Sequence, residues 1–164
     1  MREIYLVRHA IATERGESWP DDTKRPLTRD GIRRFKEAVK GLRSIGVEPD
    51  LVLTSPLTRA RQTAELLSAG LSGRPPIEIV DALAPGGAPG AIVSALRRLR
   101  VGSVALVGHE PDLGHLASVL LGSGGPLAFK KGGVCRIDLA RISPRPGGTL
   151  AWLATPRLLR LGSA

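Results

Sequence analysis

The stretch Leu6-Val7-Arg8-His9-Ala10 decides how the rest of the chain can be interpreted. It closes an apolar run, residues 4–7, which predicts a short buried strand. Ligands of an open α/β sheet bind in the crevice outside the carboxyl ends of the strands. Arg8 and His9 stand at that point, so we expect them to hold an anion and act on it chemically. On its own, the pair also fits a surface arginine beside a hydrogen-bonded structural histidine.

A second histidine follows another strand in the same way. Residues 103–107, Ser-Val-Ala-Leu-Val, form the clearest strand in the sequence. They continue directly into Gly108-His109-Glu110. His109 therefore occupies the position after its strand that His9 occupies after the first, which is not expected by chance. The remaining histidine, His115, falls in the middle of a predicted helix, where we expect a packing or surface role.

An arginine accompanies a third strand end. Residues 51–54 predict a buried strand, and Ser55-Pro56-Leu57-Thr58 leads from it into a helix that runs to about Ser68. Arg59 lies in the first turn of that helix, where backbone N–H groups also attract anions. Taken by itself, Arg59 is better explained as a solvated helix charge.

Helices and strands alternate along the chain, which predicts an α/β fold. Thr28 is a plausible N-cap for a helix whose apolar face ends at Ile45 and which stops at Gly46. We predict one domain, residues 1–164 with a core at about 4–154: a three-layer α/β/α sandwich with a mostly parallel sheet and an antiparallel edge. The other expected elements are a strand over 77–80, a helix over 91–99, a helix from Pro111 to Gly122, strands over 134–139 and 149–154 joined by residues 143–148, and a tail over 156–164.

Composition narrows the class of protein. The 164 residues are 42% hydrophobic but only 3% aromatic, so Leu, Val, Ile and Ala must build the core. We expect no membrane span and no secretory segment, and the single cysteine, Cys135, allows no internal disulfide, which favours a cytoplasmic protein. The net charge of +9 suits acidic partners. Nucleic acid is disfavoured among them, because no basic run is interleaved with aromatic side chains.

The combination of these segments resembles the histidine phosphatase superfamily, which has a phosphoglycerate-mutase-like fold. The resemblance is carried by Arg8-His9, by Ser55-Pro56-x-x-Arg59-Ala60-x-x-Thr63 and by Gly108-His109, and it covers residues 4 to about 154. Within the superfamily, the short chain, Arg25-Pro26-Leu27-Thr28 with Gly31, and Leu83-x-Pro85-x-Gly87 resemble the SixA-type phosphohistidine phosphatases.

The resemblance implies that His9 is the nucleophile of a phosphatase and forms a transient phospho-His9 intermediate. It implies that Arg8, Arg59 and His109 complete the phosphate pocket, without a cofactor. The chemistry agrees, because neutral imidazole is nucleophilic near neutral pH and guanidinium groups donate paired hydrogen bonds to phosphoryl oxygens. These cations replace a metal ion, and three histidines and one cysteine provide no good ligand set for a transition metal.

The general acid is where the sequence departs from the family pattern. Phosphatases of the mutase branch carry Glu two residues after a Leu in the loop that follows the third strand, and here that position is Pro85. The acid-phosphatase branch carries an acidic residue after the second histidine, and here that residue is Glu110, which fits a helix-start charge equally well. Asp81 is a weaker candidate. Imidazole leaving from phosphohistidine can take its proton from solvent beforehand, so Pro85 favours that substrate.

We therefore expect a metal-independent phosphohydrolase that removes phosphate from phosphohistidine in a protein. A phosphatase of a small phosphorylated metabolite, such as a sugar or acid phosphate, is the alternative enzyme, and a mutase is disfavoured because the chain lacks room for insertions. A non-catalytic module that binds a phosphorylated ligand is the alternative from another class, and a nucleic-acid binder is the weakest. We expect a shallow crevice rimmed by residues 11–25 and Lys130-Lys131, with Thr13 and Ser55 as weaker phosphate contacts.

Overall fold

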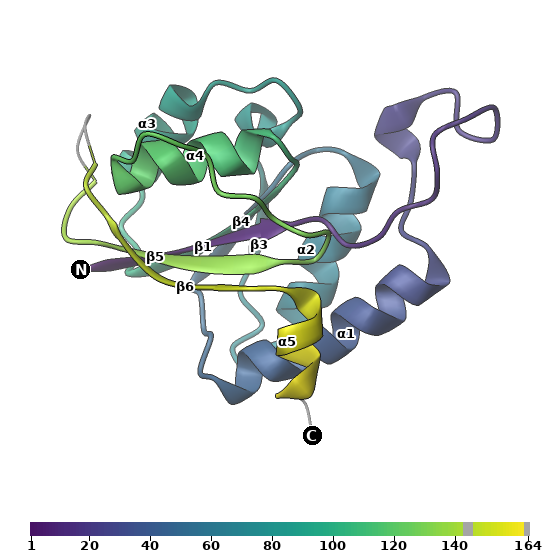
Figure 1. The fold of residues 1–164 in the computed structure, drawn as a ribbon, viewed down its shortest axis with the longest axis horizontal. Helices are drawn as coiled ribbons and strands as arrows, with labels where there is room; N and C mark the ends of the chain where they lie inside the picture. Colours follow the sequence, from purple (N-terminus) through teal and green to yellow (C-terminus); the bar gives the residue numbers. More distant parts are fainter. Residues whose placement is uncertain (143–145, 163–164) are drawn as a thin grey trace.

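The computed structural model describes residues 1–142 and 146–162, which form one six-stranded sheet with helices around it (Figure 1). None of the described helices is long and apolar enough to cross a membrane. The strands are β1 (Arg2–Arg8), β2 (Leu51–Thr54), β3 (Ile77–Ile79), β4 (Ser103–Gly108), β5 (Val134–Leu139) and β6 (Thr149–Ala154). The helices are α1 (Arg29–Ser44), α2 (Thr58–Gly70), α3 (Pro89–Arg98), α4 (Asp112–Leu121) and α5 (Pro156–Leu161), with short 3-10 helices η1 (Asp22–Lys24) and η2 (Asp81–Leu83).

The strand order is β3-β2-β4-β1-β5-β6. Strands β3, β2, β4 and β1 are parallel, β5 runs antiparallel to β1, and β6 runs antiparallel to β5. The predicted mostly parallel sheet with an antiparallel edge is therefore confirmed. Residues 143–145 of the predicted β5–β6 connection lie outside the described residues. Residues 4–7 of the central strand β1 are buried, as a continuous apolar run in a parallel sheet should be.

The helices form two layers, one on each face of the sheet, so the predicted three-layer sandwich is confirmed (Figure 1). Helices α3 and α4 lie on one face, and α1, α2 and α5 lie on the other. Each face has its own hydrophobic core, with Phe35 and Leu67 in one and Leu96 and Leu116 in the other. The chain leaves β1 toward α1 on one face and leaves β4 toward α4 on the other. The neighbouring carboxyl ends of β1 and β4 are therefore a topological switch point, where sheets of this kind bind ligands.

Helix α1 begins and ends close to where the sequence predicts. The hydroxyl of Thr28, the N-cap, accepts a hydrogen bond from the backbone N–H of Gly31 at 2.9 Å. Gly46 adopts a positive φ of 77° just beyond the helix, which glycine does without strain. The expectation that Ile45 belongs to the apolar face is wrong, because Ile45 is 56% exposed. The helix ends at Ser44, so the side chain of Ile45 no longer follows the apolar stripe.

The predicted tail is wrong, because residues 156–161 form helix α5. Its start has two ordinary signals: the hydroxyl of Thr155 accepts a hydrogen bond from the N–H of Leu158, and Pro156 lies in the first turn. Leu159 is buried against α1, where a glycine permits close approach. A Cβ atom at Gly41 would lie only 1.9 Å from the carbonyl oxygen of Leu159.

The start of helix α4 also differs from its prediction. The helix begins at Asp112, and Pro111 is its N-cap rather than its first helical residue. The carboxylate of Glu110 accepts a hydrogen bond from the backbone N–H of Gly114 at 3.0 Å. This side chain therefore satisfies one of the free N–H groups of the first turn, a role that Pro111 cannot fill.

Candidate active site

The register of the sheet places His9 beside His109. Arg8, the last residue of β1, pairs with Gly108, the last residue of β4, so the next residue of each strand emerges at the same edge. The backbone N–H of His9 donates to the carbonyl oxygen of Gly108 at 3.0 Å. The centroids of the two imidazole rings are 5.2 Å apart, and both histidines are buried. The structure thus brings together the two histidines that the strand ends singled out.

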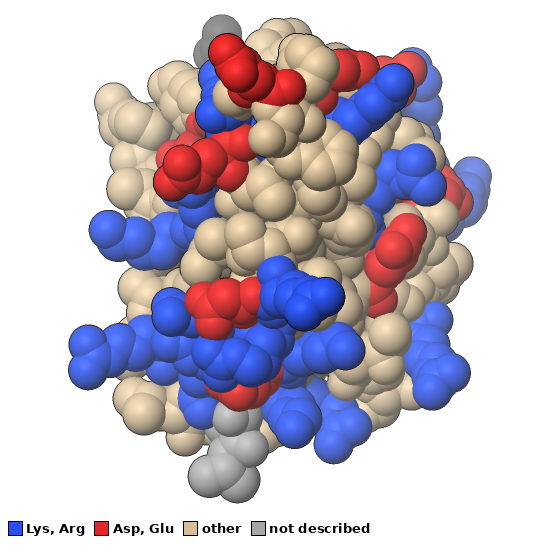
Figure 2. Space-filling model, turned by 90° about the vertical axis from the view of Figure 1, so that its right-hand side faces the viewer, with Lys and Arg blue, Asp and Glu red and all other residues tan. Residues whose placement is uncertain are grey.

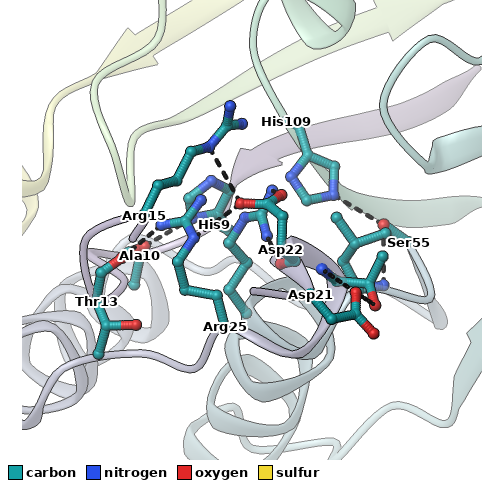
Figure 3. Close-up of polar contacts among 12 residues, drawn as sticks. His9, Ala10, Thr13, Arg15, Asp21, Asp22, Arg25, Ser55 and His109 are labelled. Atoms are coloured by element: carbon teal, nitrogen blue, oxygen red, sulfur yellow. Dashed lines mark hydrogen bonds and ion pairs between the residues drawn. The ribbon is translucent and has the colours of Figure 1, made fainter. Parts of the chain in front are cut away.

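One hydrogen bond determines which nitrogen of His9 is free. The Nδ1 atom of His9 lies 2.7 Å from the carbonyl oxygen of Ala10 (Figure 3). A carbonyl oxygen only accepts, so Nδ1 carries the proton and Nε2 of the neutral ring keeps its lone pair. Burial, together with the positive charges of Arg59 and Arg8, lowers the pKa of His9 to about 4. The ring is therefore neutral at pH 7 and nucleophilic at Nε2.

His109 is oriented by Ser55, which follows β2. The Nε2 atom of His109 lies 2.8 Å from the hydroxyl oxygen of Ser55, and this oxygen also accepts a hydrogen bond from the backbone N–H of Leu57 at 3.3 Å (Figure 3). The hydroxyl proton is thus available to Nε2, which leaves Nδ1 as the donor of a neutral His109. Burial and the neighbouring ring of His9 lower the pKa of His109 to about 3. Ser55, a weaker candidate for a phosphate contact, contacts this histidine.

Arg8 and Arg59 enter the same cavity from two elements. Arg8 ends β1, and its Nη1 donates to the carbonyl oxygen of Phe129 at 2.7 Å. Arg59 lies in the first turn of α2, and burial lowers the pKa of its guanidinium. Within the described part of the chain, the buried Nε atoms of both arginines and the buried Nδ1 of His109 have no hydrogen-bond partner. Arg8, Arg59 and His109 line, with His9, a cavity of about 400 Å³.

The loop of residues 11–25 adds two residues that the sequence did not identify as part of the site. Asp22 of η1 accepts ion pairs from Arg25 at 3.0 Å, from Arg59 at 3.1 Å and from the exposed Arg15 at 3.1 Å (Figure 3). Burial opposes the charge of Asp22, but the hydrogen bond from Arg25 and the charge of Arg59 outweigh it and lower the pKa of this carboxyl. Arg25 is buried and also donates to the carbonyl oxygen of Thr13 at 2.6 Å. The sequence did contain a signal for this ion pair. Asp22 and Arg25 are three residues apart, and Arg25 begins the segment Arg25-Pro26-Leu27-Thr28 that resembles SixA-type proteins.

The candidate acids fall at different places. Glu110 lines the cavity, and burial raises the pKa of its carboxyl, although the N–H of Gly114 and the charge of Arg8 oppose the shift. Pro85 also lines the cavity. It occupies the position at which phosphatases of the mutase branch carry Glu. Asp81 is exposed in η2 and is not among the described residues that line the cavity. Of the two candidate acids, Glu110 therefore lies at the cavity, and its carboxylate also caps the first turn of α4.

The expected rim is present in part. Thr13 and Lys131 line the cavity, whereas Lys130 lines a neighbouring groove. His115 is exposed on α4, in agreement with its expected surface role. On the face of the molecule that carries the strand ends, Lys and Arg side chains gather over the half that α1 and α5 occupy (Figure 2). The surroundings of the cavity therefore attract anions.

Comparison with known proteins agrees with this geometry. The family model of the histidine phosphatase superfamily (branch 1) matches residues 4–84. An uncharacterized protein of Picosynechococcus sp. is 38% identical over 164 residues, covering 96% of this chain and 98% of that protein. Phosphohistidine phosphatase SixA of Escherichia coli (strain K12) is 28% identical over 165 residues, covering 99% of both chains.

The fold is also similar to that of a solved structure. The structure of the protein histidine phosphatase SixA complexed with tungstate superimposes with a TM-score of 0.85 and 29% identity, covering 96% of this chain and 99% of that one. The predicted phosphoglycerate-mutase-like fold and the resemblance to SixA-type proteins are therefore confirmed. Strand order, paired histidines and sequence similarity lead to one conclusion: the chain belongs to the histidine phosphatase superfamily, whose members are phosphatases.

Proposed function

We propose that this protein is a phosphohydrolase that uses His9 as its nucleophile and removes phosphate from phosphohistidine in a protein. The observation that carries the proposal is that Arg8, Arg59 and His109 line one cavity with His9. Each of the three also has a buried nitrogen without a hydrogen-bond partner among the described residues. Leaving buried polar groups unpaired costs free energy unless a ligand satisfies them. A phosphoryl group supplies three oxygens that share its negative charge, which suit N–H donors.

The first step transfers the phosphoryl group to the enzyme. The Nε2 lone pair of His9 attacks phosphorus, and the bond between phosphorus and the substrate imidazole breaks. That imidazole leaves with the electron pair as a neutral ring, because its other nitrogen already carries a proton. The phosphorylated His9 keeps its proton on Nδ1, where the hydrogen bond to Ala10 stabilises the positive ring. Arg8, Arg59 and His109 offset the charge on the equatorial oxygens.

The second step returns the enzyme to its starting state. The oxygen of a water molecule attacks phosphorus, the bond to Nε2 of His9 breaks, and its electron pair returns to that nitrogen. Both protons of the water leave with the product as dihydrogen phosphate, so neither step needs a side chain to transfer a proton. The guanidinium groups supply the positive charge that other phosphatases take from a metal ion, and we propose that the reaction is metal-independent.

The choice of phosphohistidine rests on the acid position and on similarity. Pro85 lines the cavity where an acidic residue would assist an alkoxide leaving group, and imidazole needs no such help. The related protein of Escherichia coli is a phosphohistidine phosphatase, and the similar SixA structure is complexed with tungstate, an oxyanion. Both observations support the same substrate class for this chain.

A phosphatase of small phosphorylated metabolites is the second candidate. Glu110 favours it, because a carboxyl group with a raised pKa at the edge of the cavity can protonate an alkoxide leaving group. The two candidates differ in what Glu110 must do, which makes them separable by experiment.

The test compares two classes of substrate in the purified protein, with His9→Ala as control. One is a protein or peptide that carries phosphohistidine, and the other is a panel of phosphorylated sugars and acids. We expect rapid dephosphorylation of phosphohistidine, little turnover of the panel, no activity in His9→Ala and no effect of a metal chelator. The reverse preference would identify a metabolite phosphatase, and activity that survives in His9→Ala would reject the nucleophile.

A further inference from the structure

A groove of about 390 Å³ lies beside the cavity that His9, Arg59 and His109 line, which we call the catalytic cavity. Apolar residues of its lining include Ile11, Phe35 and Pro156, contributed by the loop after β1, by α1 and by α5. Its wall is shared with the catalytic cavity, because Lys131 lines both and because Ala10, which follows the nucleophile His9, lines the groove. The groove therefore adjoins the catalytic cavity.

The groove is bordered by basic side chains. We call it the basic groove, after Arg34, Lys130, Lys131, Arg157 and Arg160 in its lining. Arg34 pairs with Asp30 at 2.7 Å, and Arg160 lies 3.9 Å from Glu37. Lys130, Lys131 and Arg157 form no ion pair with any acidic residue that the structure describes. None of the described residues that line the groove is acidic. Most of the positive charge of the groove is therefore not balanced by a neighbouring negative charge.

The groove is tied to the nucleophile by its backbone. The N–H of Gly132, which lines the groove, donates to the carbonyl oxygens of Arg8 and His9 at 3.1 and 3.0 Å. A ligand seated in the groove would thus lie at a defined place relative to Nε2 of His9. Residues a few positions away from a phosphohistidine in the catalytic cavity can occupy it.

Resting on the proposed function, we propose that the basic groove binds an acidic segment of the phosphorylated protein substrate, next to its phosphohistidine. Positive charge around an apolar floor complements a segment with both acidic and apolar side chains. A small metabolite would be enclosed by the catalytic cavity alone and would not reach the groove. Nucleic acid fits poorly, because Phe35 is the only aromatic residue among the described lining residues and is 2% exposed, too little for a base to stack on it.

The groove should act on substrate binding rather than on the chemical step. Charges on the rim of an interface steer association and select the partner, and salt screens them. We therefore expect KM to depend on the residues that flank the phosphohistidine, and this dependence to weaken as the salt concentration rises. The value of kcat should stay the same, because none of these charges except Lys131 lines the catalytic cavity.

The experiment uses two phosphohistidine peptides that differ only in having Glu or Gln at the flanking polar positions, together with phosphoramidate as a substrate without flanks. In the natural protein the Glu peptide should have a KM about tenfold lower than the Gln peptide. The double variant Lys130→Glu with Arg157→Glu should raise the KM of the Glu peptide to that of the Gln peptide. Turnover of the Gln peptide and of phosphoramidate should not change.

The matched control is the double variant Arg100→Glu with Arg141→Glu, which changes the net charge equally. These two exposed arginines line a separate cavity with Arg2, the first residue of β1, at the opposite end of the sheet. The control should keep the preference for the Glu peptide. Equal KM values for the two peptides in the natural protein, or equal losses in both double variants, would overturn the proposal.

A binding measurement separates this proposal from the proposed function. Fluorescence polarisation of a labelled Glu peptide without phosphate reports on the groove alone, and it should weaken in the Lys130→Glu, Arg157→Glu variant. If that binding is found but no phosphohistidine peptide is turned over, the groove stands and the proposed function fails. Duplex DNA and the unlabelled peptide are then compared as competitors of the labelled peptide. If the DNA displaces it at the lower concentration, the groove binds nucleic acid and the proposal is overturned.

Discussion

The carboxylate of Asp22 lies 3.1 Å from the Nη2 atom of Arg59, an arginine that lines the cavity. Arg59 also donates to the backbone carbonyl of Asp22 at 2.9 Å, so the guanidinium holds η1 by two contacts. The lowered pKa of Asp22 keeps its carboxyl ionised at neutral pH. An anion of the protein therefore already holds arginines that line the cavity, and it must coexist with a bound phosphate or compete with it for them.

Replacing Asp22 by Asn should strengthen anion binding. The variant keeps the shape of the side chain but removes a negative charge that repels phosphate, which is worth about 1–2 kcal/mol at this range and corresponds to roughly tenfold in affinity. The inhibition constant of inorganic phosphate, measured by competition with phosphoramidate, should fall by about that factor.

Asp21→Asn is the control for that experiment. Asp21 is exposed and contacts Thr23 and Lys24 rather than the arginines of the pocket, so phosphate inhibition should not change. Weaker phosphate binding in Asp22→Asn would show that the carboxylate organises the arginines instead of competing for them.

Two histidines with lowered pKa values should make stability depend on pH. In the unfolded chain both rings take up protons near pH 6.5, whereas folded His9 and His109 do so only near pH 4 and pH 3. The unfolded state therefore binds more protons in that window, and the free energy of unfolding should fall as pH drops from about 6.5 to about 4. Each histidine contributes up to about 1.4 kcal/mol per pH unit.

Urea denaturation of the natural protein and of His109→Asn at pH 7, 5.5 and 4.5 checks this expectation. The variant lacks one of the two groups, so its free energy of unfolding should decline less steeply over the window. Parallel declines in the two proteins would contradict the lowered pKa of His109. The same reasoning predicts that kcat/KM is lost only as pH falls toward about 4, where His9 becomes protonated.

Removing the hydroxyl of Ser55 should slow the chemical step. In Ser55→Ala, His109 loses the hydrogen bond that fixes its ring and leaves Nδ1 as the donor. A hydrogen bond of this kind is worth about 1–1.5 kcal/mol, so kcat should fall about tenfold with little change in KM. Ser44→Ala, which loses hydrogen bonds to Gly41 and Gly162 far from the cavity, should leave kcat unchanged. An increase in KM alone would assign Ser55 to substrate binding.

Glu110→Gln distinguishes the two substrate classes. Hydrolysis of a phosphohistidine peptide should change by less than about threefold, because imidazole leaves without a new proton. Hydrolysis of an alkyl phosphate, however slow, should fall by about 100-fold, because the alkoxide needs a proton from the carboxyl. Asp81→Asn should alter neither rate. Loss of phosphohistidine hydrolysis in Glu110→Gln would contradict the substrate assignment.

The sequence predicted the elements that depend on local patterns. Buried strands appear as apolar runs, and the strand ends therefore placed Arg8, His9 and His109 at one edge of the sheet before their contacts were known. Asp22 could not be placed in this way. Its contact with Arg59 joins positions 37 residues apart, and the loop that carries it has no periodicity from which a position can be inferred.

Helix α5 was not predicted, although its start signals are local. Its start signals, Thr155 and Pro156, are present in the sequence, but a six-residue helix gives too short a pattern for periodicity to reveal. Its stability depends on burying Leu159 against α1, where Gly41 allows the approach. Such a contact is a property of the folded chain, and it also creates one side of the basic groove.

A phosphoryl group that passes through Nε2 of His9 leaves a phosphorylated histidine, which can be trapped. The protein is mixed with a phosphohistidine peptide, quenched in alkali within the first turnover, digested and examined by mass spectrometry, with His9→Ala and His109→Asn in parallel. We expect alkali-stable phosphate on His9 in the natural protein and none on His109. Phosphate on His109, or full turnover in His9→Ala without any phosphorylated enzyme, would contradict this expectation.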